Sequence, residues 1–333
     1  MSSPSSICMF FPLPDSWGAA GNYIYLILGL IILLGSGEYL VRSGVSLGRR
    51  TGISELVIGV TVISIGTSMP ELIVSLQAAL SGHPDISVGN VVGSNISNIS
   101  LVLALTILII PLAVNRISLI KDGPFMIFIT LLLILFSTDK LLSRMEGTIL
   151  LSLVVIYSVW IIHNSRRHER LHPQHRKIPA YSVSVTLLIM VLAGFGLVLG
   201  AHWLVSGASG VARSFGVSER VISLSIIALG TSLPELSTSV MAAIRKHADV
   251  SVGNIIGSNI FNIGGILGTT AFIVPLKIND RILQFDYWWM FLISGLLLLL
   301  ASLKLRLTRW KGALLLFLYL LYLVLIFTKK SGV

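Results

Sequence analysis

The sequence predicts an all-α polytopic membrane protein with about ten transmembrane helices, arranged as two inverted five-helix repeats with broken helices at the midplane. Three observations predict this fold. Only 11% of the 333 residues are charged, and the mean hydropathy is +0.91. A motif-rich stretch occurs twice, 164 residues apart, and prolines and glycines interrupt both copies at the same places. Because soluble domains carry about 25% charged residues, the composition argues against a soluble enzyme.

Apolar runs long enough to cross a bilayer recur along the whole chain, and each crossing needs about 20 residues. The tail at 1–21 has no Lys or Arg and so lacks the basic start of a secretory signal; we expect a short translocated tail. A basic linker at 164–180, too short for a regulatory domain, separates a first repeat at 22–163 from a second at 181–333. The ten expected segments are 22–41, 53–80, 86–113, 122–138, 146–163, 181–206, 217–244, 250–275, 284–303 and 312–328.

The basic residues are distributed unevenly over the connections. Sixteen of the 24 fall in connections that follow odd-numbered segments. Basic connections remain cytoplasmic, so both termini are predicted to lie outside, in what we expect to be a prokaryotic cytoplasmic membrane. The net charge of +10 then sets orientation and does not indicate a nucleic-acid partner. Five segments per half make the second copy enter the bilayer from the opposite side, which relates the halves by a pseudo-twofold axis in the membrane plane.

The repeated stretch places helix-breaking and polar residues inside apolar segments. Residues 66–71 (GTSMPE) return as 230–235 (GTSLPE), and 89–98 (GNVVGSNISN) return as 253–262 (GNIIGSNIFN). Between 66–99 and 230–263, 21 of 34 residues are identical. Pro and Gly break or loosen a helix, and irregular backbone at membrane depth is tolerated where it lines a cavity. The duplication therefore predicts one site assembled from two halves.

Two acidic residues stand out by their depth. Of the fourteen, only Glu71 and Glu235 lie well inside the apolar segments, where a charge costs at least about 2.5–3.5 kcal/mol. Two equivalent carboxylates brought together by symmetry repel each other, so one would hold a proton unless a cation lies between them. No Lys or Arg in these segments neutralises them. A mobile cation is the natural partner.

The surrounding side chains supply hydroxyl and amide oxygens. Such hard ligands suit Ca²⁺, Mg²⁺ or Na⁺, whereas Zn²⁺ or copper would call for Cys and His, and Cys8 is the single cysteine. Any one of these hydroxyls has the alternative of bonding back to its own helix. We expect no cofactor apart from the transported ions. The oxygen-bearing residues are Thr67, Ser68, Ser75, Ser94 and Asn98, with Thr231, Ser232, Ser239, Ser258 and Asn262.

The duplicated GTSxPE and GNxxGSNxxN elements resemble the α-repeats of the cation/calcium antiporters, specifically the bacterial and archaeal sodium/calcium exchangers. The resemblance runs through nearly the whole chain and implies exchange of Na⁺ for Ca²⁺ by alternating access. Some relatives carry Asp at the position of Asn262, and in potassium-dependent exchangers that Asp is linked to potassium co-transport. The resemblance therefore implies that this chain, with Asn262, is independent of potassium. The implied ion ligands are Glu71, Glu235, Thr67, Ser68, Ser94, Asn98, Thr231, Ser232, Ser258 and Asn262, with backbone carbonyls of Ser64 and Ala228 completing sodium sites.

Three other functions compete with this interpretation. A proton/calcium exchanger would load protons on the same two glutamates. An intramembrane enzyme is disfavoured because the chain has no HExxH pair and neither repeat sets a histidine base beside a serine. A channel is disfavoured because paired broken helices in inverted halves are typical of alternating access. His83 and His247, beside Asp85 and Asp249, are expected either to guard an ion path or to be interfacial loop residues.

Overall fold

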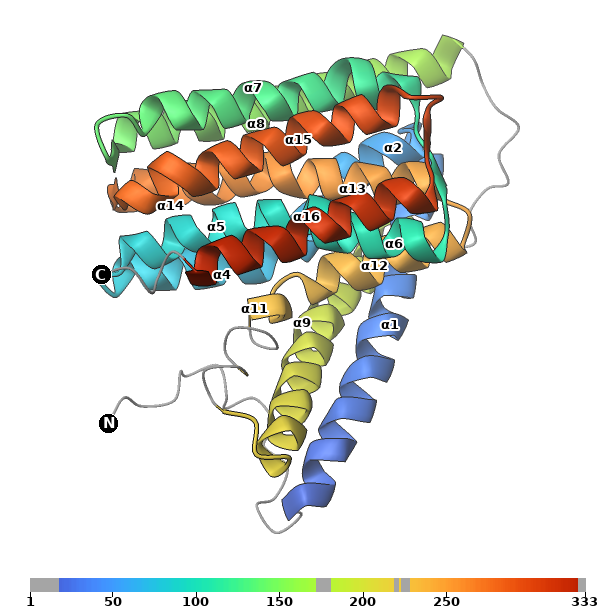
Figure 1. The fold of residues 1–333 in the computed structure, drawn as a ribbon. Helices are drawn as coiled ribbons and strands as arrows, with labels where there is room; N and C mark the ends of the chain where they lie inside the picture. Colours follow the sequence, from blue (N-terminus) through green and yellow to red (C-terminus); the bar gives the residue numbers. More distant parts are fainter. Residues whose placement is uncertain (1–17, 172–180, 219–221, 223–227, 329–333) are drawn as a thin grey trace.

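The computed structural model of the protein describes residues 18–171, 181–218, 222 and 228–328 (Figure 1). Within this part of the chain, eight helices are long and apolar enough to cross a membrane, and a ninth span results if the bent pair Glu55–Thr67 and Met69–Leu80 is counted as one. The seventh predicted segment, 217–244, lies partly outside the described residues. The all-helical fold predicted from the sequence is confirmed.

The first half begins with the long helix α1, continues through a broken span and a second interrupted helix, and ends with two further spans. Its elements are α1 (Gly18–Thr51), α2 (Glu55–Ile58), the π-helix η3 (Gly59–Ile63), α3 (Ser64–Thr67), α4 (Met69–Leu80), α5 (Pro84–Ser97), the π-helix η4 (Asn98–Leu103), α6 (Ala104–Ile109), β1 (Leu112–Ala113), η5 (Ser118–Asp122), α7 (Gly123–Phe136), β2 (Leu141–Leu142) and α8 (Arg144–Leu171).

The second half repeats this order, and the described elements lie about 164 residues beyond their counterparts. They are α9 (Val183–Ser214), α11 (Ala228–Gly230), α12 (Leu233–Ile244), α13 (Ala248–Phe261), the π-helix η7 (Asn262–Leu267), α14 (Gly268–Ile273), β3 (Leu276–Lys277), η8 (Ile282–Asp286), α15 (Tyr287–Ser302), β4 (Arg306–Leu307) and α16 (Arg309–Thr328).

Two very short antiparallel sheets join the halves and fix their relative orientation. Leu112 of β1 pairs with Leu307 of β4, and Leu142 of β2 pairs with Leu276 of β3. The first sheet joins the connections after the third and ninth predicted segments, and the second joins those after the fourth and eighth. Connections of the same parity therefore share a face of the molecule, as an inverted repeat with five spans per half requires.

Several helix ends differ from the predicted boundaries. α1 continues to Thr51 and α9 to Ser214, well beyond the predicted ends at 41 and 206, and α8 extends to Leu171 inside the predicted linker. Helical hydrogen bonding continues after the apolar run has ended, so hydropathy alone underestimates these helices. The third and eighth segments end earlier than predicted, at Ile109 and Ile273, because the chain turns into β1 and β3 after α6 and α14.

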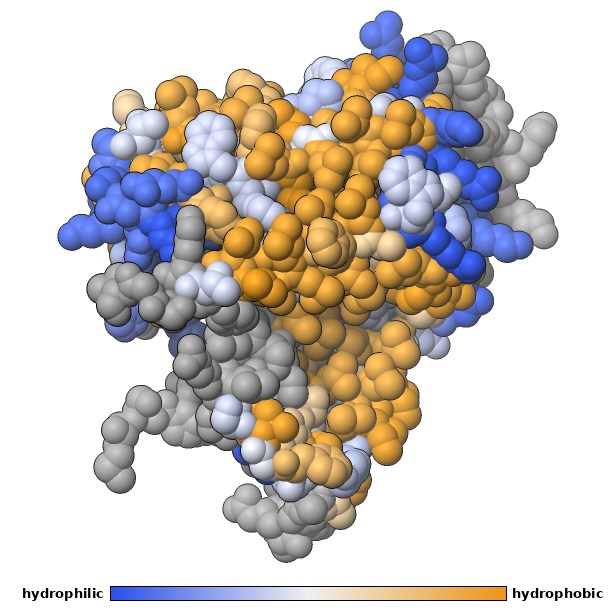
Figure 2. Space-filling view, viewed as in Figure 1, coloured by the Kyte–Doolittle hydropathy of each residue, from blue (hydrophilic) through white to orange (hydrophobic). Residues whose placement is uncertain are grey.

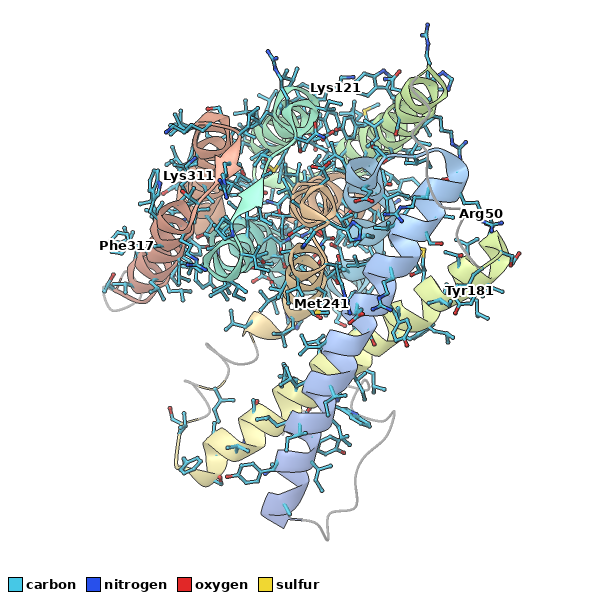
Figure 3. All side chains as sticks on the ribbon, turned by 90° about the vertical axis from the view of Figure 1, so that its right-hand side faces the viewer. Arg50, Lys121, Tyr181, Met241, Lys311 and Phe317 are labelled. Atoms are coloured by element: carbon cyan, nitrogen blue, oxygen red, sulfur yellow. The ribbon has the colours of Figure 1, made fainter. Side chains whose placement is uncertain are left out.

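The long helices α1 and α9 lie side by side and cross the remaining bundle at a steep angle (Figures 1 and 3). Glycines permit this contact: a Cβ on Gly29 would lie 2.3 Å from the backbone nitrogen of Leu204, and one on Gly200 would lie 2.5 Å from that of Leu33. Small residues allow membrane helices to approach closely. The α1–α9 pair contacts the rest of the protein chiefly through α12.

The other helices run roughly parallel to each other, with α13 and its continuation almost wholly buried in the bundle (Figures 1 and 3). Figure 2 shows an apolar surface across the middle of this bundle and hydrophilic residues gathered at both of its ends. A lipid bilayer matches such a belt, because its hydrocarbon core contacts only apolar side chains. The protein is therefore a multi-pass membrane protein.

The broken helices are found where the repeated prolines predict them. The first broken span bends by 46° between α3 and α4, and Ser68 at the break has ψ 8° in place of a helical value. Pro70 and Pro234 occupy the first turns of α4 and α12, where a missing backbone donor costs nothing. Each break thus creates a new helix N-terminus inside the bundle.

Candidate cation site

The two glutamates lie at these internal helix starts. Glu71 is in the first turn of α4 and Glu235 in the first turn of α12, and both side chains are 0% exposed. A helix N-terminus carries a partial positive charge that favours a carboxylate there. Ser68, which precedes α4, donates a hydrogen bond to Glu235 across the interface between the halves. The pair therefore lies buried at that interface, and neither glutamate faces lipid.

Five buried oxygens without hydrogen-bond partners belong to these glutamates and to two asparagines of the repeated element. Both carboxylate oxygens of Glu71, Oε2 of Glu235, and the amide oxygens of Asn98 and Asn262 accept no hydrogen bond. The described residues contain just one other buried carboxylate or amide oxygen in this condition, on Asp122. Since unpaired buried acceptors are costly, their concentration in four sequence-equivalent residues indicates a place for a positive ligand.

These oxygens come from elements that pack against each other across the two halves. Glu71 lies on α4, which packs against η7, the segment that begins with Asn262. Glu235 lies on α12, which packs against η4, the segment that begins with Asn98. The helix that carries the glutamate of each half therefore packs against the segment that begins with the asparagine of the other half. Both asparagines begin π-helical segments, an irregularity frequent at functional sites.

Hydroxyl groups next to the glutamates are arranged differently in the two halves. Ser68 donates a hydrogen bond of 2.9 Å to Oε1 of Glu235, and the hydroxyls of Thr67 and Ser258 lie beside the same carboxylate. Ser232, the equivalent of Ser68, instead pairs with the hydroxyl of Ser97 at 2.7 Å. The carboxylate of Glu235 thus accepts a hydrogen bond from the protein, whereas the carboxylate of Glu71 accepts none.

The remaining predicted ligands are mostly bonded to their own helices. Ser94 donates to the carbonyl of Asn90 at 2.8 Å. The carbonyl of Ser64 accepts from the Ser68 amide at 3.0 Å and from the Thr67 hydroxyl at 3.2 Å, so it is not free in this structure. Thr231 lies half-buried in the break, and Ala228 begins α11, with its side chain outside the description.

Two asparagines that the sequence interpretation did not assign to the site support its walls. Asn90 donates from Nδ2 to the Ser75 hydroxyl at 2.9 Å, and its equivalent Asn254 donates to the Ser239 hydroxyl at 3.1 Å. Asn254 also accepts from Thr67 across the interface between the halves at 3.3 Å. Both are the second residue of the repeated GNxxGSNxxN element, and this repetition was the sequence signal that could have identified them.

Polar contacts join the two halves at one end of the bundle. His247 Nδ1 lies 2.7 Å from Glu55 Oε2, and Asn115 donates to Asp249 at 3.2 Å. At the opposite end the equivalent residues His83 and Asp85 are exposed. The two ends thus differ in the contact made by Asp249 and Asp85, whereas residue 219, the equivalent of Glu55, lies outside the described residues. Whether these histidines guard an ion path stays a prediction.

The donor set fits a hard cation. Among the described residues no group of three or more His, Cys, Asp or Glu side chains forms a metal cluster, so a cation would rely on two carboxylates with neutral oxygens. Calcium takes about six to eight oxygens. The five unpaired oxygens, supplemented by hydroxyls or water, approach that number.

Comparisons with known proteins agree with this geometry. The family model described as sodium/calcium exchanger protein matches residues 21–163 and 185–328. The chain is 37% identical to the putative antiporter CaxA of Alkalimonas amylolytica and 30% identical to the sodium/calcium exchanger MaX1 of Methanosarcina acetivorans, in each case over 92% of this chain and 98% of the relative. A solved structure of the sodium-calcium exchanger NCX_Mj matches with a TM-score of 0.79 and 33% identity, over 92% of this chain and 98% of that one.

Proposed function

The chain belongs to the sodium/calcium exchanger family, and from this premise we propose that it exchanges Na⁺ for Ca²⁺ by alternating access at the site between Glu71 and Glu235. The observation that carries the proposal is the group of five buried, unpaired oxygens contributed by both halves. Two carboxylates match the charge of one Ca²⁺, and the same oxygens used in other combinations serve Na⁺, which also prefers hard ligands.

The proposed ligands divide by role. Glu71 and Glu235 provide the charge, and the amide oxygens of Asn98 and Asn262 complete the coordination of the divalent ion. Ser68 holds the Glu235 carboxylate through its hydrogen bond. We further propose that Thr67, Ser94, Thr231, Ser232 and Ser258, with the carbonyls of Ser64 and Ala228, contribute oxygens once the site rearranges around Na⁺.

Ion-driven flux tests this function. Proteoliposomes loaded with Na⁺ and diluted into Na⁺-free buffer should take up radioactive Ca²⁺, and a proton uncoupler should leave the uptake unchanged. Uptake that instead follows an imposed pH gradient and ignores Na⁺ would identify a proton/calcium exchanger. The matched control is Ser100→Ala, which removes a buried hydroxyl bonded to its own helix at the Ile96 carbonyl and should transport as the wild type does.

We propose that transport is independent of K⁺, because position 262 carries a neutral amide. Replacing external K⁺ by choline should leave Ca²⁺ uptake unchanged in the wild type. The substitution Asn262→Asp adds a carboxylate and should alter the dependence of uptake on K⁺, Na⁺ or pH. An unchanged dependence on all three in the variant would show that this residue does not set cation selectivity.

We also propose that both termini lie outside, with the basic connections in the cytoplasm of a prokaryotic cell. Arg116 and Asp280 are exposed, are equivalent in the two repeats, and belong to opposite faces under this topology. In a Cys8→Ser background, Asp280→Cys should react with a membrane-impermeant maleimide added to intact cells, and Arg116→Cys should not. Labelling of both from the same side would contradict the inverted topology.

A further inference from the structure

Four asparagines form a symmetric hydrogen-bonded network between the two halves, here called the ring, in which Asn95 and Asn259 bond to each other and Asn98 and Asn262 are attached to them. Asn95 donates from Nδ2 to the Asn259 carbonyl, and Asn259 donates from Nδ2 to the Asn95 carbonyl, each at 3.2 Å. Asn259 Oδ1 accepts from Asn98 Nδ2 at 3.2 Å, and Asn95 Oδ1 accepts from Asn262 Nδ2 at 3.0 Å. All four side chains are buried, and the ring maps onto itself when the two repeats are exchanged.

The two main-chain carbonyls determine the orientation of every amide in this ring. A carbonyl oxygen only accepts hydrogen bonds, so the side-chain atoms facing it from Asn95 and Asn259 are nitrogens. The oxygens of those two amides must then face Asn98 and Asn262, which present their nitrogens in return. The assignment of nitrogen and oxygen, often ambiguous for asparagine, is thereby fixed.

The outcome is that Asn98 and Asn262 have their amide nitrogens engaged and their oxygens unpaired. These are the two amide oxygens that lack any partner in the buried site. We infer that Asn95 and Asn259 are positioning residues that hold the amide oxygens of Asn98 and Asn262 toward the transported cation and keep the amide hydrogens away from it. This inference rests on the proposed function for the identity of the cation.

The ring also couples the halves, since each cation-facing amide is oriented by the opposite repeat. A partner that orients a metal ligand typically matters about 10–100-fold for metal affinity. Without its partner, an amide rotates freely and presents its hydrogens to the cation in part of the population. A carboxylate has no such problem, because both of its terminal atoms are oxygens. A carboxylate in place of the amide therefore distinguishes a residue that orients the amide from one that only supports the structure.

The test is a double-substitution cycle read by equilibrium binding of radioactive Ca²⁺ to the purified full-length protein. Asn95→Leu should weaken Ca²⁺ binding by about tenfold or more. Adding Asn262→Asp to Asn95→Leu should then restore binding, because an oriented amide is no longer needed. In the wild-type background Asn262→Asp places a carboxylate oxygen against Asn95 Oδ1, and the two oxygens repel each other. The gain in Ca²⁺ affinity from Asn262→Asp should therefore be at least about tenfold smaller there than in the Asn95→Leu background. The mirrored pair Asn259→Leu and Asn98→Asp should give the same result independently.

Equal effects of Asn262→Asp in both backgrounds, or full Ca²⁺ affinity in Asn95→Leu, would overturn the inference. Ser100→Ala, a buried hydroxyl change in the same segment, should bind Ca²⁺ as the wild type does. If Asn95→Leu gives no monodisperse protein, Asn95→Ser removes the carboxamide with less apolar bulk. A wild type that binds no Ca²⁺ would contradict the proposed function instead, and the same variants would then be compared by thermal stabilisation with Na⁺.

Discussion

The two copies of the motif are nearly identical in sequence, yet their contacts at the site differ. Ser68 donates to Glu235, whereas its equivalent Ser232 pairs with Ser97 and leaves Glu71 with both oxygens unpaired. A single set of residues therefore supports two arrangements within one molecule. An inverted repeat that holds its halves in different conformations is open toward one side only, and exchange of the two arrangements reverses that side.

One end of the bundle carries close contacts between the halves. Gly257 of α13 packs so closely on the first half that a Cβ there would lie 2.3 Å from the Val60 carbonyl oxygen, and this end also carries the Glu55–His247 contact. Asn115 donates to Asp249 at the same end, whereas Asp85, the equivalent of Asp249, is exposed. These contacts give several ways to break or sharpen the comparison.

The largest effect is expected for the two glutamates, because each half should contribute one of them to the site. Glu71→Gln or Glu235→Gln leaves a divalent cation with one buried counter-charge, and breaking a buried ion pair costs about 3–5 kcal/mol, roughly a hundredfold or more. Sodium-driven Ca²⁺ uptake should fall to background in both variants, while the amount inserted in the membrane is unchanged. Near-normal uptake in either variant would remove that glutamate from the site.

Substitution of Gly257 should loosen the contact between the halves at this end. Gly257→Ala drives a methyl group into the Val60 backbone, and overpacking of this kind typically costs about 1–3 kcal/mol, so this end should open more often. Maleimide labelling of a cysteine introduced at Asn115, which bonds across this end, should increase in Gly257→Ala and stay unchanged in Gly295→Ala, where nothing in the described part of the chain lies within 4 Å of an added Cβ. Equal labelling in the two variants would show that the packing of Gly257 does not hold this end together.

The serine pair should show a smaller and unequal effect. Ser68→Ala removes a hydrogen bond to a charged group, worth about 1.5–3 kcal/mol, whereas Ser232→Ala removes a hydroxyl–hydroxyl bond worth about 0.5–1.5 kcal/mol. Ca²⁺ binding should therefore weaken about tenfold or more in the first variant and only a few-fold in the second. Equal losses would mean that the observed difference between the halves does not persist during binding.

The smallest functional effect is expected at the Glu55–His247 contact, which is partly exposed to solvent. Exposed ion pairs contribute about 0.2–1 kcal/mol, so Glu55→Gln should change the Ca²⁺ uptake rate only a few-fold. The matched variant Asp85→Asn lies at the other end, where the carboxylate is exposed. A total loss of uptake in Glu55→Gln would give this contact a role beyond closing one end.

The repeated motif made the central part of the site predictable. The depth of Glu71 and Glu235 in apolar sequence indicated burial, and Pro70 and Pro234 located the breaks, because both follow from local chemistry. The equivalence of the halves followed from the duplication and the odd number of segments. These features depend on residue type and spacing alone.

The contacts between halves were not predictable in the same way. The ring through Asn95 and Asn259 joins residues 161 to 167 positions apart, and its partners depend on how the repeats dock. The difference between Ser68 and Ser232 depends on conformational state, which two nearly identical sequences cannot encode separately. The two-residue strands have too few residues to show an alternating pattern.

The most direct measurement locates the bound divalent ion. Crystals of the protein soaked in Sr²⁺ at low Na⁺ and analysed by anomalous diffraction should show one strong peak contacted by carboxylate oxygens of both Glu71 and Glu235, with the amide oxygens of Asn98 and Asn262 completing its shell. A peak that touches only one of the two glutamates, or that lies elsewhere in the bundle, would contradict a shared site between the halves.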